Sequence, residues 1–370
     1  MEFLVTEMSF NGFAIEAGYA PCTPINDYVL YGKGDREDVL TGQGFVVWDT
    51  KEMAAMIDWI RDYNEDVPMN KKVRFYGLDY AYNGLGAQRI LGYLQRNGAD
   101  NVLAVDSLFQ NIAKIERERW PLNMSKVQDG LKGLVPKVQL LIDYLATNKE
   151  KLSSKSSSPE LDGIMMHTMA IKQWVVNNIS DSIPASAIAN MARSRSMANN
   201  LFQILDIDEA VKKVVVWEHN VHVGIGEMET GEPNMGDEFR TKYGDAYYAM
   251  GFEFNEGSYQ SRIVLPDNSL GDLKTNSVAP APEGYLAWYL SKAMKGISFL
   301  DLRTPVSVSS IEKWMNTPQT FRYFGWLRHD ISLRKTIPRV RYDGILFIEE
   351  TSPTIPTSNA LMTVAKGEGL

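Results

Sequence analysis

Short apolar runs that alternate with helical segments constrain the fold of this chain more than any other feature of its sequence. Eight runs have the length and composition of buried β-strands: residues 13–15, 73–76, 102–104, 214–217, 247–254, 261–265, 297–300 and 344–348. Most are separated by helical periodicity; residues 50–65, for example, place apolar side chains on one face behind Thr50 or Asp49 as N-cap. This alternation predicts an α/β protein with a central mixed or mostly parallel sheet and flanking helices.

One long stretch departs from the alternation. Residues 106–206 carry helical patterns and almost no strand signal, interrupted by the polar patch "KLSSKSSSPE", which we interpret as a loop between helices. We therefore expect residues 1–105 and 207–350 to form two parts of one α/β core, with residues 106–206 inserted as a helical subdomain. Residues 351–370 are rich in Pro, Ser and Thr, and we expect a peripheral or disordered tail there.

Charge and cysteine content restrict the partners and the compartment. A net charge of −8 and a pI near 5.2 argue against a nucleic-acid binder and suit a neutral or cationic small molecule. The single cysteine, Cys22, excludes an intrachain disulfide and fits a reducing compartment. No apolar run is long enough to span a membrane, and the first residues lack a signal-peptide pattern. We expect a cytoplasmic protein, although a signal peptide encoded upstream would not be visible.

Ionisable residues directly follow three of the apolar runs. Glu16 follows the first run, Asp79 lies in "VRFYGLDY", and "VVVWEHNVH" carries His219, Asn220 and His222. In α/β sheets, ligands bind at the carboxyl ends of the strands, where loops present side chains to one crevice. The three segments together therefore predict a functional site.

Each of these residues also has a structural interpretation. Glu16 can cap a strand or pair with an arginine, and Asp79 can cap a turn or a helix. His219 and His222 face opposite sides on a strand and share one face on a helix, while in a loop either can point into a crevice. Two histidines behind a Val-rich strand favour function. The two other histidines, His167 and His329, are expected to be structural.

A metal site made of Glu16, His219 and His222 stays open, because imidazole and carboxylate are both zinc ligands. However, the H-x-x-H spacing is not the H-E-x-x-H of the helical metalloproteases, and there is no cysteine cluster. We therefore expect no required cofactor and keep a divalent metal as an alternative. Serine hydrolases, nucleotidases and classical dehydrogenases lose support, because the chain has no G-x-S-x-G, P-loop or G-x-G-x-x-G motif.

Motifs spread over the chain resemble, in order and approximate spacing, those of the erythromycin esterase family. They are "FAIEAGYAPCTPINDYV", "WDTKEMAAMIDWIRDYN", "VRFYGLDY", "ARSRSMANNL", "VVVWEHNVHVG", "MGDEFRTKYGDAYYAMGFEFNEGSY", "LDLR" and "FRYFGW". The resemblance runs from the first residues to about Ile348. Characterised members hydrolyse the macrolactone ester of macrolide antibiotics. The resemblance therefore implies an ester hydrolase with a bulky, macrolide-like small-molecule substrate and a role in antibiotic inactivation.

The resemblance also implies roles for individual residues. Water attacks the ester carbonyl in this family, activated by a histidine general base and without a covalent acyl-enzyme. The family's active-site glutamate falls on Glu16, and its paired histidines fall on His219 and His222. Asp79 falls on the aspartate of the G-x-D segment, and Asn220 lies between the histidines, so both are expected to contact the substrate.

The main departure from the family lies at the start of the chain. The family carries its general base on a Gly-Glu-x-x-His-Gly-Thr loop, and no such segment precedes Glu16. We interpret the chain as a truncated form of a complete esterase, with a natural variant that has lost the base as the competing explanation, and expect the chain as given to have little or no esterase activity. Two alternatives stay open: a metal-dependent hydrolase that uses Glu16, His219 and His222 as ligands, and a non-catalytic protein that binds an ester-containing natural product.

Overall fold

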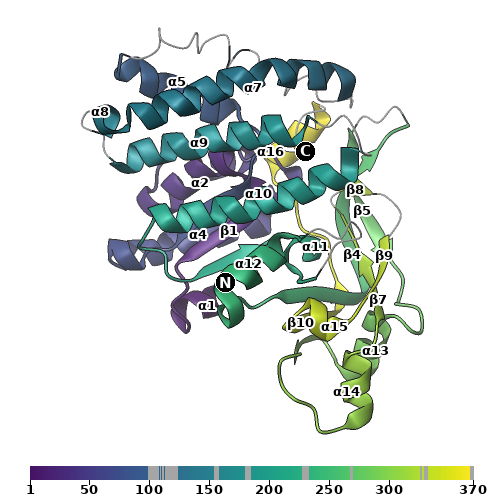
Figure 1. The fold of residues 1–370 in the computed structure, drawn as a ribbon. Coiled ribbons are helices and arrows are strands. Elements are labelled where there is room, and N and C mark those ends of the chain that lie inside the picture. Colours follow the sequence, from purple (N-terminus) through teal and green to yellow (C-terminus); the bar gives the residue numbers. More distant parts are fainter. Residues whose placement is uncertain are drawn as a thin grey trace. The chain divides into compact units, whose positions relative to one another are not determined.

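The computed structural model describes residues 1–98, 108, 110, 112, 124–153, 158–179, 185–226, 233–266, 270–325, 327–328 and 332–366 (Figure 1). Helices flank sheets that contain parallel strands, which confirms the expected α/β class. The chain divides into two compact units, one formed by Met1–Trp217 and the other essentially by Glu218–Pro266 and Leu270–Glu368. The finer expected division, into a core with a helical insertion and a tail, stays a prediction.

The first unit contains a three-stranded parallel sheet. Its strands are β1 (Gly12–Gly18), β2 (Arg74–Asp79) and β3 (Val214–Trp217), in the order β2-β1-β3. Phe13 of β1 lies opposite Phe75 on one side and Val215 on the other. Almost all of β1 is buried, as expected of a parallel strand covered on both faces. Because the strands are parallel, their carboxyl ends lie at one edge of this sheet.

Helices form most of the rest of the first unit: α1 (Glu2–Thr6), α2 (Tyr19–Tyr31), α3 (Arg36–Thr41), α4 (Lys51–Glu65), α5 (Gly84–Arg96), α7 (Met124–Thr147), α8 (Lys149–Ser153), α9 (Ser158–Asn177) and α10 (Ala185–Ile207). The helix expected over residues 50–65 is confirmed as α4, and Thr50 is its N-cap, accepting a hydrogen bond from Met53 N at 3.2 Å. Among the described helices, none is long and apolar enough to cross a membrane.

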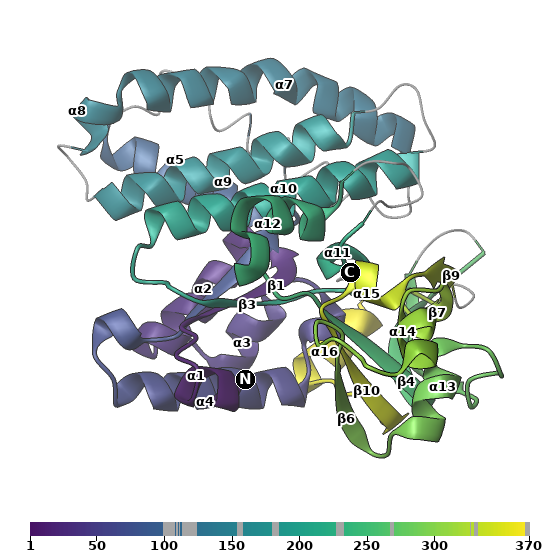
Figure 2. The same ribbon diagram turned by 60° about the horizontal axis from the view of Figure 1, so that its bottom comes forward.

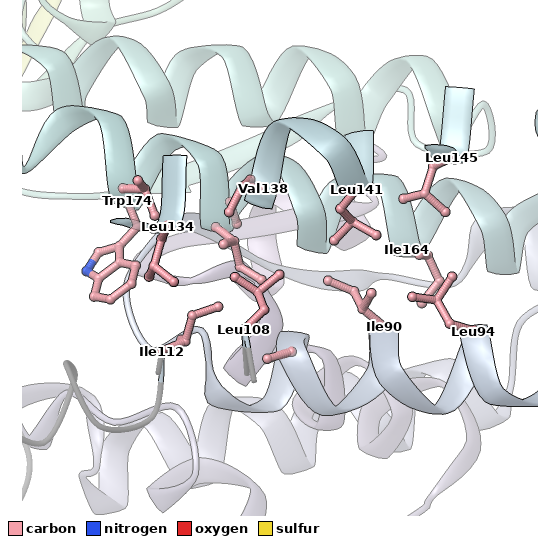
Figure 3. Close-up of a cluster of buried hydrophobic side chains, with 14 of the residues drawn as sticks. Ile90, Leu94, Leu108, Ile112, Leu134, Val138, Leu141, Leu145, Ile164 and Trp174 are labelled. Atoms are coloured by element: carbon pink, nitrogen blue, oxygen red, sulfur yellow. The ribbon is translucent and has the colours of Figure 1, made fainter. Parts of the chain in front are cut away.

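A separate apolar core holds α5, α7 and α9 together. Figure 3 shows Ile90 and Leu94 of α5 facing Leu141 and Leu145 of α7, and a larger set of buried aliphatic side chains and Trp174 completes the cluster. Burial of one such side chain contributes roughly 1.5–3 kcal/mol. Within residues 106–206, the structure describes the helices α7, α8, α9 and α10, up to Asp206. The strand expected at 102–104 lies outside the described residues.

The second unit is built on a mixed sheet (Figure 2). Its strands β4 (Met250–Val264), β5 (Leu270–Val278), β6 (Ile297–Asp301) and β10 (Gly344–Thr351) lie in the order β5-β4-β10-β6, and β8 (Leu327–Arg328) also pairs with β4. Strand β10 runs parallel to β4 and antiparallel to β6. The two strands expected at 247–254 and 261–265 are thus parts of one long strand, β4.

Shorter elements complete the second unit: β7 (Gln319–Tyr323) pairs with β9 (Ser332–Thr336), and the helices are α11 (Asn220–Val223), α12 (Met235–Tyr243), α13 (Leu286–Ala293), α14 (Ser309–Met315), α15 (Pro338–Arg341) and α16 (Ser358–Ala365). Helix α16 shows that part of the expected tail is helical.

One buried face of β4 carries an ionisable side chain, Glu253. This residue is 3% exposed, and its Oε1 has no hydrogen-bond partner among the described residues. Burial raises the pKa of Glu253 to about 8, although the charge and the backbone N–H of Arg322 oppose the shift. The folded protein therefore favours the neutral carboxylic acid.

We expect Glu253→Gln to stabilise the protein in a pH-dependent way. An unfolded glutamate ionises near pH 4.5, whereas Glu253 in the folded protein ionises near pH 8. The free energy of unfolding of the native protein therefore falls as the pH rises between these values. The neutral amide has no such loss. The variant and the native protein should differ little at pH 5, and the variant should be more stable at pH 8 by on the order of a few kcal/mol. Urea unfolding at both pH values measures the difference.

Glu349 provides a control of opposite sign. Its pKa is lowered by the backbone N–H of Gly296 and by Lys295, so Glu349→Gln should weaken the fold at pH 8 rather than strengthen it. A gain from Glu253→Gln that is the same at pH 5 and pH 8 would contradict the assignment of a buried neutral acid.

Candidate active site

A buried group of three charged residues lies at the carboxyl edge of the parallel sheet. Arg193 of α10 contacts Glu16 of β1, with Nη1 2.8 Å from Oε1. The same guanidinium contacts Asp79, the last residue of β2, with Nη2 at 2.8 Å and Nε at 2.9 Å from Oδ2. The side chains of Glu16, Asp79 and Arg193 are only 17%, 2% and 18% exposed. We refer to these three residues as the ion cluster.

Electrostatics keep the guanidinium of the ion cluster charged. Burial alone would favour loss of its proton, but the neighbouring carboxylates of Asp79 and Glu16 outweigh this effect and raise the pKa of Arg193 well above its usual value. Two carboxylates therefore share one guanidinium. Such a site can accept hydrogen bonds from an imidazole or a water molecule.

The backbone around the ion cluster fixes its geometry. Asp79 Oδ1 accepts a hydrogen bond from the backbone N of Tyr80 at 2.7 Å, which orients the carboxylate. A Cβ on Gly77 would lie 2.3 Å from the carbonyl oxygen of Gly18, so the close approach of β1 and β2 requires glycine there. Asn200 donates to the carbonyl oxygen of Leu78 at 2.8 Å and ties α10 to β2. Arg193 therefore projects from a helix that is anchored to the sheet.

Two other ionisable side chains of the first unit, His167 and Cys22, have pKa values shifted by burial. Burial lowers the pKa of His167 to about 3, with a smaller contribution from Arg89, and the ring lies 5.2 Å from that of Tyr19. The interpretation of His167 as a packed side chain agrees with its 3% exposure. Burial, and then the charge of Asp79, raise the pKa of Cys22, so this thiol does not ionise near neutral pH. His329 lies outside the described residues.

His219 caps a short helix in the second unit. Its Nδ1 accepts a hydrogen bond from the backbone N of Val221 at 3.2 Å, at the start of α11. Its Nε2 lies 2.7 Å from the carbonyl oxygen of Phe324. Because a carbonyl oxygen can only accept, Nε2 carries the proton and Nδ1 does not. The protein thus selects one neutral tautomer of His219.

Asn220 fixes the same helix to the mixed sheet. Its side-chain Nδ2 donates to the carbonyl oxygen of Phe252 at 2.6 Å, and its Oδ1 accepts from the backbone N of Phe252 at 2.9 Å. His222 follows within α11 and is 5% exposed. Of the strand, helix and loop alternatives that the spacing of the two histidines left open, the structure shows a helical turn, with His219 as its N-cap and His222 within it.

The structure thus gathers the expected site residues into two groups. Glu16 and Asp79 meet around Arg193 in the first unit, and in the second unit Asn220 and His222 lie in α11, with His219 as its N-cap. Each unit is described by itself, so the joining of both groups in one site is a prediction. Among the described residues, no three His, Cys, Asp or Glu side chains are grouped so that they could hold a metal ion.

Sequence reasoning missed Arg193. The signal available for it is weak: one of two arginines in "MARSRSMANN", among small and apolar residues that pack on a helix face. Its partners are 177 and 114 residues away in the sequence, so no local pattern could have paired them.

The chain belongs to the erythromycin esterase family, whose model matches residues 5–351. Two curated relatives are similar over nearly its whole length. YbfO of Bacillus subtilis (strain 168), which carries a hydrolase name, is 20% identical over 96% of this chain and 80% of its own. Erythromycin esterase type II of Escherichia coli is 21% identical over 95% of this chain and 84% of its own.

Solved structures share the fold. A protein from Bacillus cereus has a TM-score of 0.77 and 23% identity, covering 96% of this chain and 85% of that one. A mutant of the erythromycin esterase EreC in its open conformation has a TM-score of 0.66 and 14% identity, covering 94% and 85%. At these identities the structural likeness concerns the fold alone.

We expect Arg193→Met to lower the free energy of unfolding by about 3–5 kcal/mol, because it leaves the buried carboxylate of Asp79 without its cation. Urea unfolding measures the loss. The matched control is Arg96→Gln, which removes an exposed ion pair with Glu160 at 2.7 Å and should cost about 0–1 kcal/mol.

The double variant Arg193→Met with Asp79→Asn distinguishes a charge effect from a packing effect. Removal of the buried negative charge should restore part of the stability lost in the single variant. Strictly additive losses would show that Arg193 acts through packing alone.

Proposed function

We propose that this protein is an ester hydrolase that cleaves a bulky, macrolactone-type ester by attack of water. Family membership over residues 5–351 supports the class of reaction. The observation that carries the proposal is the buried ion cluster: Glu16 is held by Arg193, next to Asp79, at the carboxyl edge of a parallel sheet. Ligands of α/β proteins bind at that edge.

Chain connectivity supports the participation of the histidines. Strand β3 is parallel to β1, so its last residue, Trp217, lies at the same edge of the first sheet as Asp79. His219 follows Trp217 by two residues and begins the α11 turn. The chain therefore passes from the end of β3 to His219 within two residues.

The proposed reaction needs one proton acceptor and one proton donor. The oxygen of water bonds to the ester carbonyl carbon, the ester C–O bond breaks, and the leaving alkoxide takes a proton, which gives a hydroxy acid. Glu16, fixed by Arg193, accepts a hydrogen bond from the imidazole or water that starts the attack. His219 has its proton on Nε2 and can donate it to the carbonyl oxygen or the alkoxide when it exchanges Phe324 for substrate.

Other residues of the site support these groups. Asp79 positions Arg193, and Asn220 fixes the α11 turn that presents His222. Direct contact of Asp79 and Asn220 with the substrate stays a prediction. The family's general base is expected on a Gly-Glu-x-x-His segment, which does not occur among the 370 residues of this sequence. The test below therefore includes residues encoded in frame before Met1.

The substrate class and the location are part of the proposal. A net charge of −8 favours a neutral or cationic ester, such as a macrolide with an amino sugar, and its hydrolysis would inactivate the antibiotic. The single, buried Cys22 supports a reducing compartment such as the cytoplasm.

The test follows macrolide hydrolysis by mass spectrometry, as the appearance of a product that has gained one water. It uses the 370-residue chain and the same chain with any residues encoded in frame before Met1. The shorter chain is expected to show little or no turnover and the longer chain to hydrolyse the ester. In the longer chain, Glu16→Gln and His219→Asn should each lower kcat/KM by about 100-fold or more, because each removes a group that takes part in proton transfer.

Three results would contradict the proposal. An unchanged rate in Glu16→Gln would remove Glu16 from the site. Saturable macrolide binding without hydrolysis by either chain would identify a binding protein, and activity lost on chelation and restored by zinc or manganese would identify a metal-dependent hydrolase. The exposed variant Arg96→Gln serves as the control and should keep the native rate.

A further inference from the structure

A cavity of about 410 Å³ in the second unit is lined in part by arginines, and its lining includes none of Glu16, Asp79, Arg193, His219, Asn220 and His222. Arg240 comes from α12, Arg339 from α15, and Arg303 from the segment after β6. Leu302, Tyr342 and Asp343 also line the cavity. Three separate segments therefore bring guanidinium groups to one hollow.

Three carboxylates, those of Asp245, Glu312 and Asp343, line this cavity together with the three arginines. Asp343, whose side chain is 12% exposed, accepts from two guanidiniums: Arg240 Nη2 at 2.5 Å and Arg303 Nε at 2.8 Å. The other acid near Arg240, Asp245, is fully exposed and 3.5 Å away, so solvent screens its charge. Two cations thus share Asp343, the carboxylate of the lining that is most sheltered from water.

The guanidinium of Arg240 also has hydrogen-bonding capacity left. A guanidinium has five N–H donors, and in the described part of the chain Arg240 uses only its contacts with Asp343 and Asp245. Its planar group lies 5.7 Å from the ring centre of Tyr247. Stacking on an aromatic ring holds a guanidinium in place and leaves its edge available for an anion.

Arg303 is fixed in a similar way. Its Nη1 and Nη2 donate to the carbonyl oxygens of Asp245 and Tyr247 at 3.2 and 2.7 Å, and the group lies 4.7 Å from the ring centre of Tyr248. These contacts preorganise the charge of Arg303 and leave part of its donor capacity unused by the described residues.

Arg339 has a different role. Its Nε donates to the carbonyl oxygen of Leu302 at 2.9 Å, its Nη2 donates to Thr304, and it pairs with Glu312. The N–H groups of Arg339 therefore bind the segment after β6, and its side chain forms part of the cavity wall. Leu302 and Tyr342, both 1% exposed, give the cavity an apolar floor.

We propose that this cavity binds a small organic anion through Arg240 and Arg303, with a phosphate or carboxylate group as the feature that is recognised. Guanidinium pairs bind such groups with bidentate, charge-assisted hydrogen bonds. The volume falls within the roughly 300–1,000 Å³ typical of small-molecule sites, and the apolar floor suits the organic part of the ligand. This site does not depend on the proposed ester hydrolysis.

Isothermal titration calorimetry of the purified chain with inorganic phosphate and with acetate, at low ionic strength, tests the proposal. Saturable binding of one anion per chain, weakened by added sodium chloride, is expected. Tighter binding of phosphate indicates a phosphorylated ligand and tighter binding of acetate a carboxylated one. Arg240→Gln should weaken the binding at least tenfold, because a charge-assisted contact is lost. Lys295→Gln, an exposed cation that pairs with Glu349, is the control and should bind as the native chain does.

Two further variants separate anion binding from a structural role. Arg240→Lys keeps the charge but loses the planar fork, so its affinity should lie between those of the native chain and Arg240→Gln. Asp343→Asn removes the competing carboxylate and should bind anions more tightly. Thermal melting establishes that each variant is folded. Absence of saturable binding by the native chain, undiminished binding by Arg240→Gln, or weaker binding by Asp343→Asn would overturn the proposal.

Discussion

The contact of Arg193 with both Glu16 and Asp79 is the interaction on which the proposed chemistry depends. It places a charged guanidinium where water is nearly excluded, and such a charge persists only because two carboxylates compensate for its lost hydration. The same contact fixes α10 against the ends of β1 and β2. The geometry of the candidate site and the packing of α10 on the parallel sheet therefore depend on the same three side chains. A substitution that alters the packing of α10 would also alter the geometry of the candidate site.

Sequence reasoning succeeded where local pattern and burial coincide. The strands β1 and β2 are short apolar runs because both faces of a parallel strand are covered, whereas the edge strand β3 is an apolar run that is only partly buried. Helix α4 shows its apolar face and its N-cap in consecutive residues. Sequence reasoning failed for β5, a strand with few buried residues and the polar sequence "LGDLKTNSV", which carries no clear apolar alternation. It also divided β4 in two, because the polar residues in the middle of that strand interrupt the apolar signal.

The candidate site shows the same division between local and distant information. Glu16, Asp79, His219 and His222 could be selected because each directly follows an apolar run, and the end of a strand is visible in the sequence. The partner Arg193 and the tautomer of His219 could not, because they depend on Phe324 and on carboxylates more than a hundred residues away. Glu253 likewise becomes a neutral acid only through the side chains that cover β4.

The Asn220 side chain has a consequence for the two histidines beside it. With its amide paired to both backbone groups of Phe252, Asn220 occupies the place that a residue of a neighbouring strand would take. A helix of four residues is not stable by itself in water, and α11 is stabilised by the contact of Asn220 with β4. The backbone positions of His219 and His222 thus depend on the contact of α11 with the mixed sheet of the second unit.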